Sequence, residues 1–321
     1  MEVFSLERVI YQTIRYFDIF NLPVTTTQIW WCLVTEQHTG LRWGGHRQYA
    51  LADIQRELQE SSYLKENTGT TYGYYFLKGK EQLVRERLRR HSLAQDKWKI
   101  AKWCARFLAA MPFVRGLAGS GSLALDNTNE SSDLDFLVIA HPNRIWTTRL
   151  GLLLVSQLLG RRRKYWDRQA PDKLCLNHYV AASRLHLPAA LHNLYNAVQY
   201  RHLVPVYARS VVKDFQEENI GWMRQHLMAA AEVPLPHYNE IRLPRWISTV
   251  KKSIESLLLE PIGDGIEYLA EKLQRSIIAR HQGSKAGRVA LSSDELAFHP
   301  DTKVPAILAA FEQDPGQRQL L

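Results

Sequence analysis

The stretch from Val114 to Ala140, VRGLAGSGSLALDNTNESSDLDFLVIA, constrains the fold more than any other part of the sequence. It predicts an apolar strand, a Gly/Ser turn, a short helix, a polar loop, and a second apolar strand that opens with Asp133 and Asp135. Side chains on a strand alternate between the two faces of the sheet, so both carboxylates are expected on the same side. The sequence therefore predicts a pair of adjacent strands that carries two neighbouring acids.

Two carboxylates this close repel each other unless a cation joins them. Hard oxygen ligands of this kind suit Mg²⁺, which takes one or two carboxylates and completes its shell with water and substrate phosphates. The turn at Gly121 and Ser122 precedes a helix and offers backbone N–H groups and a hydroxyl to a phosphate. Together, the acids and the turn predict a site for metal-assisted phosphoryl or nucleotidyl transfer.

The order Gly-Ser, a spacer of about ten residues, and Asp-x-Asp at the start of an apolar strand resembles the signature of the polymerase-beta-like nucleotidyltransferase superfamily. The resemblance covers roughly residues 110–180. It implies that Asp133 and Asp135 hold Mg²⁺ or Mn²⁺, and that Gly121, Ser122 and Ser132 lie against the nucleotide. A second Gly-Ser pair immediately before Gly121 leaves the register of the turn open by two residues.

In that superfamily a third carboxylate usually stands on a neighbouring strand and activates the acceptor hydroxyl. Here the corresponding apolar segment is 173–180, and we expect Asn177 at its central position, with Cys175 and Tyr179 on the same face. Asp172, just before the segment, is a weaker substitute. Asn177 can offer an oxygen to a metal but cannot accept a proton. Nucleotide transfer by Asp133 and Asp135 without a base, and nucleotide binding without turnover, both stay open.

Cationic residues after the second strand offer further candidates for phosphate binding. Arg149 and Trp146 lie three residues apart on one face of an expected helix, where Arg149 would meet a nucleotide phosphate or pack within the fold. The basic run 160–164 suits the end of that helix, or it guides an anionic acceptor.

The first quarter of the chain predicts a winged-helix-like module. Apolar spacing indicates a helix over 5–19, and Thr25 with Gln28 predicts a capping box for a second helix. A third helix is marked by Leu51, Ile54 and Leu58. A hairpin follows with strands at 63–64 and 73–77, and then a long basic helix over 78–106. The third helix carries more acidic than basic residues, which favours protein contact or substrate positioning over DNA reading.

Composition narrows the class of protein. The 321 residues carry a net charge of +9, which favours phosphate-rich substrates and permits nucleic acid as a partner. The three cysteines lack CxxC spacing, which is typical of a reducing compartment, and we expect a cytoplasmic protein. Apolar runs stay short of the ~18 residues that a membrane span needs, so a membrane is not an expected partner.

The sequence as a whole predicts an α+β fold in three parts: the winged-helix-like module with the start of the basic connector at 1–90, a nucleotidyltransferase core with a small mixed sheet at 91–210, and a C-terminal helical domain at 211–321. The expected reaction moves a nucleoside monophosphate from an NTP, such as ATP, to an unidentified acceptor hydroxyl. The alternative is a catalytically weakened nucleotide sensor or adaptor that binds nucleic acid or protein through the N-terminal module.

Overall fold

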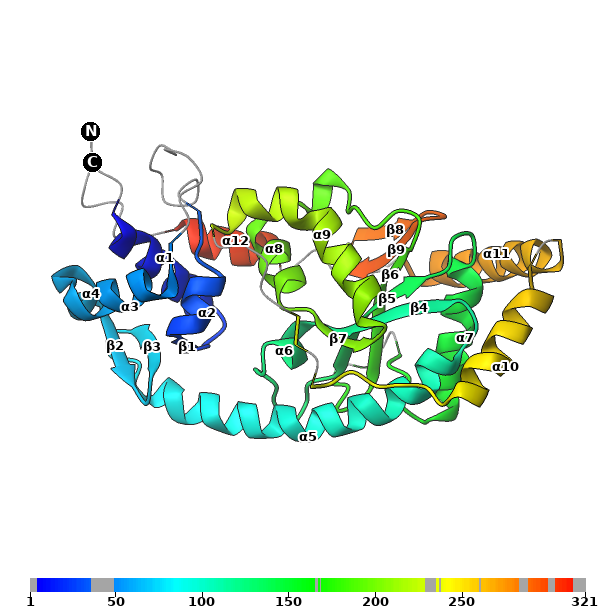
Figure 1. The fold of residues 1–321 in the computed structure, drawn as a ribbon, viewed down its shortest axis with the longest axis horizontal. Coiled ribbons are helices and arrows are strands. Elements are labelled where there is room, and N and C mark those ends of the chain that lie inside the picture. Colours follow the sequence, from blue (N-terminus) through cyan, green and yellow to red (C-terminus); the bar gives the residue numbers. More distant parts are fainter. Residues whose placement is uncertain are drawn as a thin grey trace.

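The computed structural model describes residues 5–35, 49–164, 167, 169–228, 235–236, 238–259, 261–282, 288–299 and 304–313. The chain forms an α+β fold with two separate sheets, as the sequence predicts at this level. Figure 1 shows the small sheet at the N-terminal end, the large sheet near the centre, and a long helix that runs beneath both. No helix in the described part of the chain combines the length and apolar character that a membrane crossing requires.

The N-terminal part contains short helices and a three-stranded antiparallel sheet in the order β1-β3-β2. Its elements are α1 (Leu6–Asp18), β1 (Val24–Thr25), α2 (Thr26–Trp31), α3 (Leu51–Glu60), α4 (Ser62–Asn67), β2 (Thr68–Thr71) and β3 (Tyr74–Leu77). The predicted capping box is present, because the Thr25 side chain accepts from the Gln28 backbone N–H while the Gln28 side chain accepts from that of Thr25.

One detail of the predicted hairpin is wrong. Tyr63 and Leu64, expected in its first strand, lie in α4, and the strand begins only at Thr68. The cause is local: the Ser61 hydroxyl accepts from the Leu64 backbone N–H and caps a helix there, and Leu64 is buried against the neighbouring helices.

A single long helix, α5 (Gln82–Ala110), joins the small sheet to the large one. The large sheet has six strands in the order β7-β4-β5-β6-β9-β8. Its strands are β4 (Val114–Gly119), β5 (Leu134–Ala140), β6 (Leu174–Ala181), β7 (Val204–Tyr207), β8 (Arg288–Leu291) and β9 (Glu295–His299). Only β5 and β6 pair in parallel among the described strands; every other neighbouring pair is antiparallel. The connection from β5 to β6 passes through α7, as a parallel crossover requires.

The helices around this sheet are α6 (Gly121–Ala124), α7 (Ile145–Leu158), the 3₁₀ helix η2 (Ala189–Leu191), α8 (Leu194–Arg201), α9 (Arg209–His226), α10 (Arg245–Leu257), α11 (Ile262–Gln282) and α12 (Val304–Glu312). They separate into two layers. Phe136 and Val138 face the core shared with α5 and α7, whereas Leu137 and Ile139 face the core shared with α8, α9 and the N-terminal helices. The buried strand β5 is therefore apolar on both faces beyond its opening residues.

The C-terminal third is not purely helical, which differs from the expected helical domain at 211–321. Strands β8 and β9 form a hairpin that extends the large sheet, with Leu296 of β9 paired to Tyr179 of β6. Leu296 is fully buried, so the hairpin closes what would otherwise be an exposed apolar edge of β6. After it, α12 returns to α1, where Phe311 contacts the Tyr16 ring edge-on.

His202, directly after α8, is a buried contact between the core and the N-terminal helices. Its Nδ1 donates to the Val198 carbonyl at 2.8 Å, and its Nε2 lies 3.7 Å from the Cys32 sulfur. The ring also lies against Trp31 of α2. Burial lowers the pKa of His202 to about 4, so the imidazole is neutral inside this interface at neutral pH.

We expect this histidine to destabilise the fold in mild acid. As pH falls from about 6.5 toward 4, the unfolded chain takes up a proton on His202 that the folded chain excludes, so the free energy of unfolding falls by up to about 3 kcal/mol. His202→Gln keeps a donor for Val198 and should flatten the pH dependence across this window, measured by urea unfolding at a series of pH values. The exposed His186→Gln variant should leave the wild-type slope unchanged; equal slopes for all three proteins would contradict the assignment.

Candidate functional site

The Gly-Ser turn is pressed directly against the second of the two acids. The Ser120 backbone N–H donates to the Asp135 carbonyl at 3.0 Å, which ties the end of β4 to the start of β5. Gly121 follows with φ +61°, a left-handed conformation that favours glycine. A Cβ at Gly121 would lie only 2.5 Å from Asp135 Oδ2, so glycine is needed here for space as well as for conformation.

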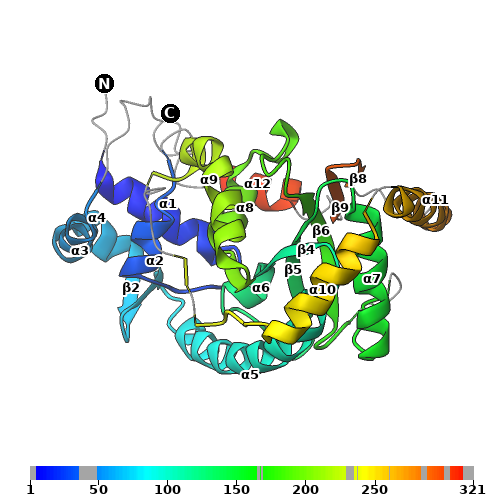
Figure 2. The same ribbon diagram turned by 45° about the vertical axis from the view of Figure 1, so that its right-hand side comes forward.

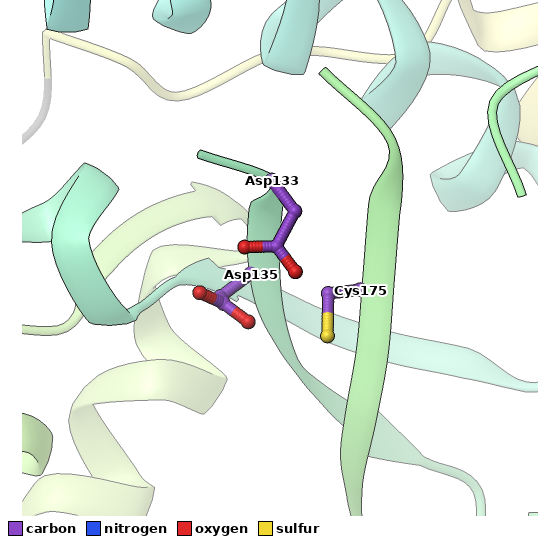
Figure 3. Close-up of side chains that lie close together, drawn as sticks. All are labelled: Asp133, Asp135 and Cys175. Atoms are coloured by element: carbon purple, nitrogen blue, oxygen red, sulfur yellow. The ribbon is translucent and has the colours of Figure 1, made fainter. Parts of the chain in front are cut away.

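Asp133 and Asp135 project to the same side of the chain, as the alternation predicts, and a thiol joins them. Figure 3 shows the two carboxylates at the start of β5, with Cys175 pointing toward them from the neighbouring strand. One ligand atom from each of the three side chains lies within 4.8 Å of the others. The two strands therefore bring two oxygen donors and one sulfur donor to a single point.

Cys175 occupies the position at which we expected Asn177. In the parallel pairing of β5 with β6, Cys175 is the partner of Asp135, whereas His178 is the partner of Leu137. The register thus shifts by one residue between these pairs, and Asn177 lies within the irregularity. The shift also moves Tyr179 into the opposite layer, where it packs in the core shared with α5 and α7. The prediction that Tyr179 and Cys175 share a face is therefore wrong.

Asp172 and Ser132 are held by other partners. Lys97 of α5 pairs with Asp172 at 2.7 Å and donates to the Ser132 carbonyl at 2.8 Å. The Ser132 hydroxyl donates to the Asn129 side chain at 3.1 Å within the loop before β5. Asp172 therefore serves to fix this loop to α5 rather than to complete the acid pair, although Ser132 stays adjacent to Asp133 in the chain.

A guanidinium is the immediate counter-charge of the acid pair. Arg163 Nη1 contacts Asp133 Oδ2 and also lies 3.3 Å from the Cys175 sulfur. Backbone hydrogen bonds place it there, because the Leu174 N–H donates to the Arg161 carbonyl at 2.7 Å and Leu174 in turn accepts from Arg163. The basic run 160–164 therefore lies beside the start of β6 and places the Arg163 guanidinium over the carboxylates.

Arg149 lies elsewhere. Its guanidinium stacks over the Phe298 ring at 4.4 Å and donates to Gln274 of α11, so it belongs to the layer of α7 and α11. Trp146 is buried in the same layer. Since Asp135 shares its face of β5 with Leu137 and Ile139, the sheet separates Arg149 from the acids. The structure does not bring Arg149 to the predicted nucleotide.

The donor set fits a divalent cation through its carboxylates, with a thiol at the third position. Burial, and then the charges of Asp135 and Asp133, raise the pKa of Cys175 well above its ordinary value, so the thiol stays protonated at neutral pH. Mg²⁺ prefers oxygen ligands, and a neutral thiol is a poor one. Asp133 and Asp135 are therefore the residues that would hold Mg²⁺ or Mn²⁺, and Cys175 would contribute little to either ion.

Sequence reasoning located the turn and the two acids but missed Cys175 and Arg163 as neighbours of the pair. A cavity of about 350 Å³ lies away from them, beyond the other end of β6, and is lined in part by His186, His192 and Glu295.

No protein-family model, curated protein or solved structure matches this chain in comparisons with known proteins.

The close approach of Gly121 to Asp135 leads to a stability prediction. Gly79 has φ +81° and open space around its Cα, so Gly79→Ala should cost only the left-handed penalty of about 1–2 kcal/mol. Gly121→Ala adds the clash with Asp135, a further ~1–3 kcal/mol. Urea unfolding of both variants measures the difference directly. Equal losses would show that the turn yields to a methyl group at no cost.

The contact between Arg163 and Asp133 leads to a binding prediction. A cation must displace the guanidinium from this carboxylate, so Arg163→Gln should bind Mn²⁺ more tightly than the wild type. An ion pair as exposed as this one is worth up to about 1 kcal/mol, which corresponds to roughly a fivefold change in affinity. Titration calorimetry without nucleotide measures it, with the adjacent Arg162→Gln as the control for net charge. Equal affinities for all three proteins would exclude competition by Arg163.

Proposed function

We propose that this chain is a nucleotidyltransferase of the polymerase-beta-like type, which moves a nucleoside monophosphate from an NTP to an acceptor hydroxyl. The observation that carries the proposal is the contact between the Gly-Ser turn and the acid pair. Gly121 lies against Asp135 Oδ2, and Asp133 stands two residues earlier, directly before β5, with its carboxylate on the same side. A triphosphate bound at the turn would therefore lie beside the two carboxylates, as metal-assisted transfer requires.

Each part of the site has a role in this proposal. Asp133 and Asp135 would hold the divalent cation, which would supply positive charge that stabilises the phosphate under attack. The turn at Gly121 and Ser122 orients the triphosphate through backbone N–H groups and a hydroxyl. Arg163, released from Asp133 by the cation, is placed to pair with a phosphate oxygen instead. Positioning and electrostatics supply most of the catalysis in such a site.

The third position limits the rate. Cys175 is the side chain nearest to the acids on β6, and the raised pKa of its thiol makes it unable to accept a proton from the acceptor hydroxyl at neutral pH. Asn177 offers no proton acceptor either. We therefore propose slow transfer without a general base, in which the residues of the chain contribute by positioning the triphosphate and the acceptor hydroxyl.

The second candidate function is a nucleotide sensor or adaptor without turnover. The specific observation in its favour is that Cys175, a neutral thiol, and Arg163 lie beside the acid pair. An active site would instead need a proton acceptor and an open metal position there. In this reading the helices α1 to α4 and the small sheet act as a winged-helix-like module that binds nucleic acid or protein. Its α3 carries Asp53 beside Arg56 in an ion pair, which argues for a protein surface over duplex DNA.

Transfer of label from α-³²P NTPs tests the two functions against each other. The chain is incubated with Mg²⁺ or Mn²⁺ and a cell extract as the pool of acceptors, and labelled products are separated by size. We expect slow labelling that is lost in the Asp133→Asn/Asp135→Asn variant, because the paired amides no longer attract the cation. The size of the product assigns the acceptor to the class of small molecules, proteins or RNA.

Asp172→Asn is the matched control. Asp172 lies two residues before β6 but pairs with Lys97 instead of the acid pair, and its φ of +55° is one that asparagine tolerates. This variant should keep the wild-type rate of labelling. Binding of NTP by the parent chain without any labelling above the double variant would favour the sensor, and labelling retained by the double variant would sink both readings of the site.

A further inference from the structure

Helices α10 and α11 both turn large apolar side chains to solvent, although Ala270 and Ile278 of α11 pack into the core and polar side chains make many of the other inward contacts. The outward side chains are large and each is more than a third exposed: Trp246, Val250, Ile254, Leu257, Leu259, Ile262, Tyr268, Leu269, Leu273 and Ile277. We call them the α10–α11 face. Trp246 is 69% exposed and Leu257 73%. In a helix that only covers a core, this stripe would be the buried one.

Charged and polar anchors fix the orientation of α10. Lys251 is buried beneath the helix, and its Nζ donates to the carbonyls of Ala109 at 2.9 Å and Val114 at 2.6 Å. One turn later, Glu255 accepts from the Phe113 backbone N–H at 2.6 Å and pairs with Arg115 at 2.8 Å. Rotating α10 to bury its apolar stripe would leave these groups unpaired, at a cost of several kcal/mol.

The inward face of α11 is held in the same manner. Glu267 accepts from the backbone N–H groups of Trp146 and Thr147, each at 2.8 Å, and so satisfies the exposed donors at the start of α7. Gln274 is buried and donates to the Trp146 carbonyl at 2.8 Å. The orientation of both helices is thus specified by polar contacts, and the outward apolar stripe is a consequence of the sequence rather than of loose packing.

The two stripes join across the turn between the helices. Leu257, Leu259 and Ile262 are all exposed there. The buried Arg144 pairs with Asp264 at 2.7 Å and holds the start of α11 in place. Figures 1 and 2 show that the turn and both helices form the end of the molecule farthest from the N-terminal helices.

The area of this surface is that of an interface. The ten side chains present on the order of 1,000 Å² of apolar surface, whereas the largest apolar patch of a typical monomer is roughly 300–600 Å². A stable protein interface buries about 800 Å² on each partner. The α10–α11 face alone is therefore large enough for a permanent contact.

We propose that the occupant is a second copy of this chain, docked through the α10–α11 face about a two-fold axis. On α11, Ile262, Leu269 and Leu273 of this face and the half-buried Ile266 between them follow one another at intervals of four, three and four residues. That spacing is typical of a seam between packed helices, and it is narrower than the broad apolar face of a helix that lies in a membrane surface. Two copies of a helical pair, each with such a stripe, bury both stripes in one four-helix contact.

This dimer leaves the acid pair open. Helices α7 and α11 cover the face of the large sheet that carries Phe136 and Val138, whereas Asp135 projects to the opposite face with Leu137. The inference is therefore independent of the proposed function, and the oligomeric state can be measured without nucleotide or metal.

Sedimentation velocity of the full chain over a range of concentrations tests the proposal. We expect a mass of twice 37.1 kDa at micromolar concentration. Leu257→Arg and Leu269→Arg each place a charge in the interface and should weaken association by at least 100-fold. Leu88→Arg is the control, since Leu88 is an exposed apolar residue on the N-terminal half of α5, outside the α10–α11 face. It should remain dimeric.

Circular dichroism separates loss of association from loss of folding. A monomeric arginine variant with the wild-type helical signal supports the interface; where an arginine variant fails to fold, Leu257→Ala and Leu269→Ala should still weaken association in a graded manner. A wild-type chain that stays monomeric at 100 µM overturns the proposal, as do arginine variants that remain dimers. Flotation of a monomeric wild-type chain with vesicles of phosphatidylcholine and phosphatidylserine would assign the face to a lipid surface instead.

Discussion

The antiparallel pairing of β4 with β5 is the interaction on which the rest of the site depends. It sets the Gly-Ser turn at one end of β4 against the opening residues of β5, and Ser120 completes the junction with a hydrogen bond to Asp135. Only glycine at 121 permits this approach, because any Cβ would meet the carboxylate. The same short contact that packs the turn also joins the Gly-Ser turn and the acid pair into one site.

The positive charge beside the acid pair comes from a part of the chain that the spacing of the two acids does not indicate. Arg163 reaches Asp133 because the segment after α7 hydrogen-bonds to Leu174 at the start of β6. The crossover from β5 to β6 therefore supplies both the third side chain, Cys175, and the counter-charge. The guanidinium beside Asp133 offsets part of the negative charge of the acid pair.

The parts of the fold that rest on local pattern could be predicted from the sequence, and the parts that rest on pairing could not. Alternation places Asp133 and Asp135 together, and the Thr25–Gln28 spacing marks a helix start. Cys175 rather than Asn177 is the partner of Asp135, because the pairing of β6 shifts by one residue, and such a shift cannot be read from the sequence of β6. The β8–β9 hairpin was missed because only the exposed edge of β6 gives those short segments a reason to be strands.

Arg149 and α10 show that local pattern is limited for helices as well: it groups residues on one face of a helix but does not say what that face contacts. Helical spacing puts Arg149 on a face with Trp146 but does not say whether that face meets the site or the far layer. For α10 the rule that the apolar stripe is buried gives the wrong side, because Lys251 and Glu255 find partners in β4 and the end of α5 that outweigh the apolar alternative. Lys251 and Glu255 each have partners on the protein side of α10. Rotation of the helix would leave both charges unpaired, which costs more free energy than leaving the apolar stripe exposed. The apolar stripe is then left on the surface, and an exposed apolar surface of that size is typical of an interaction site.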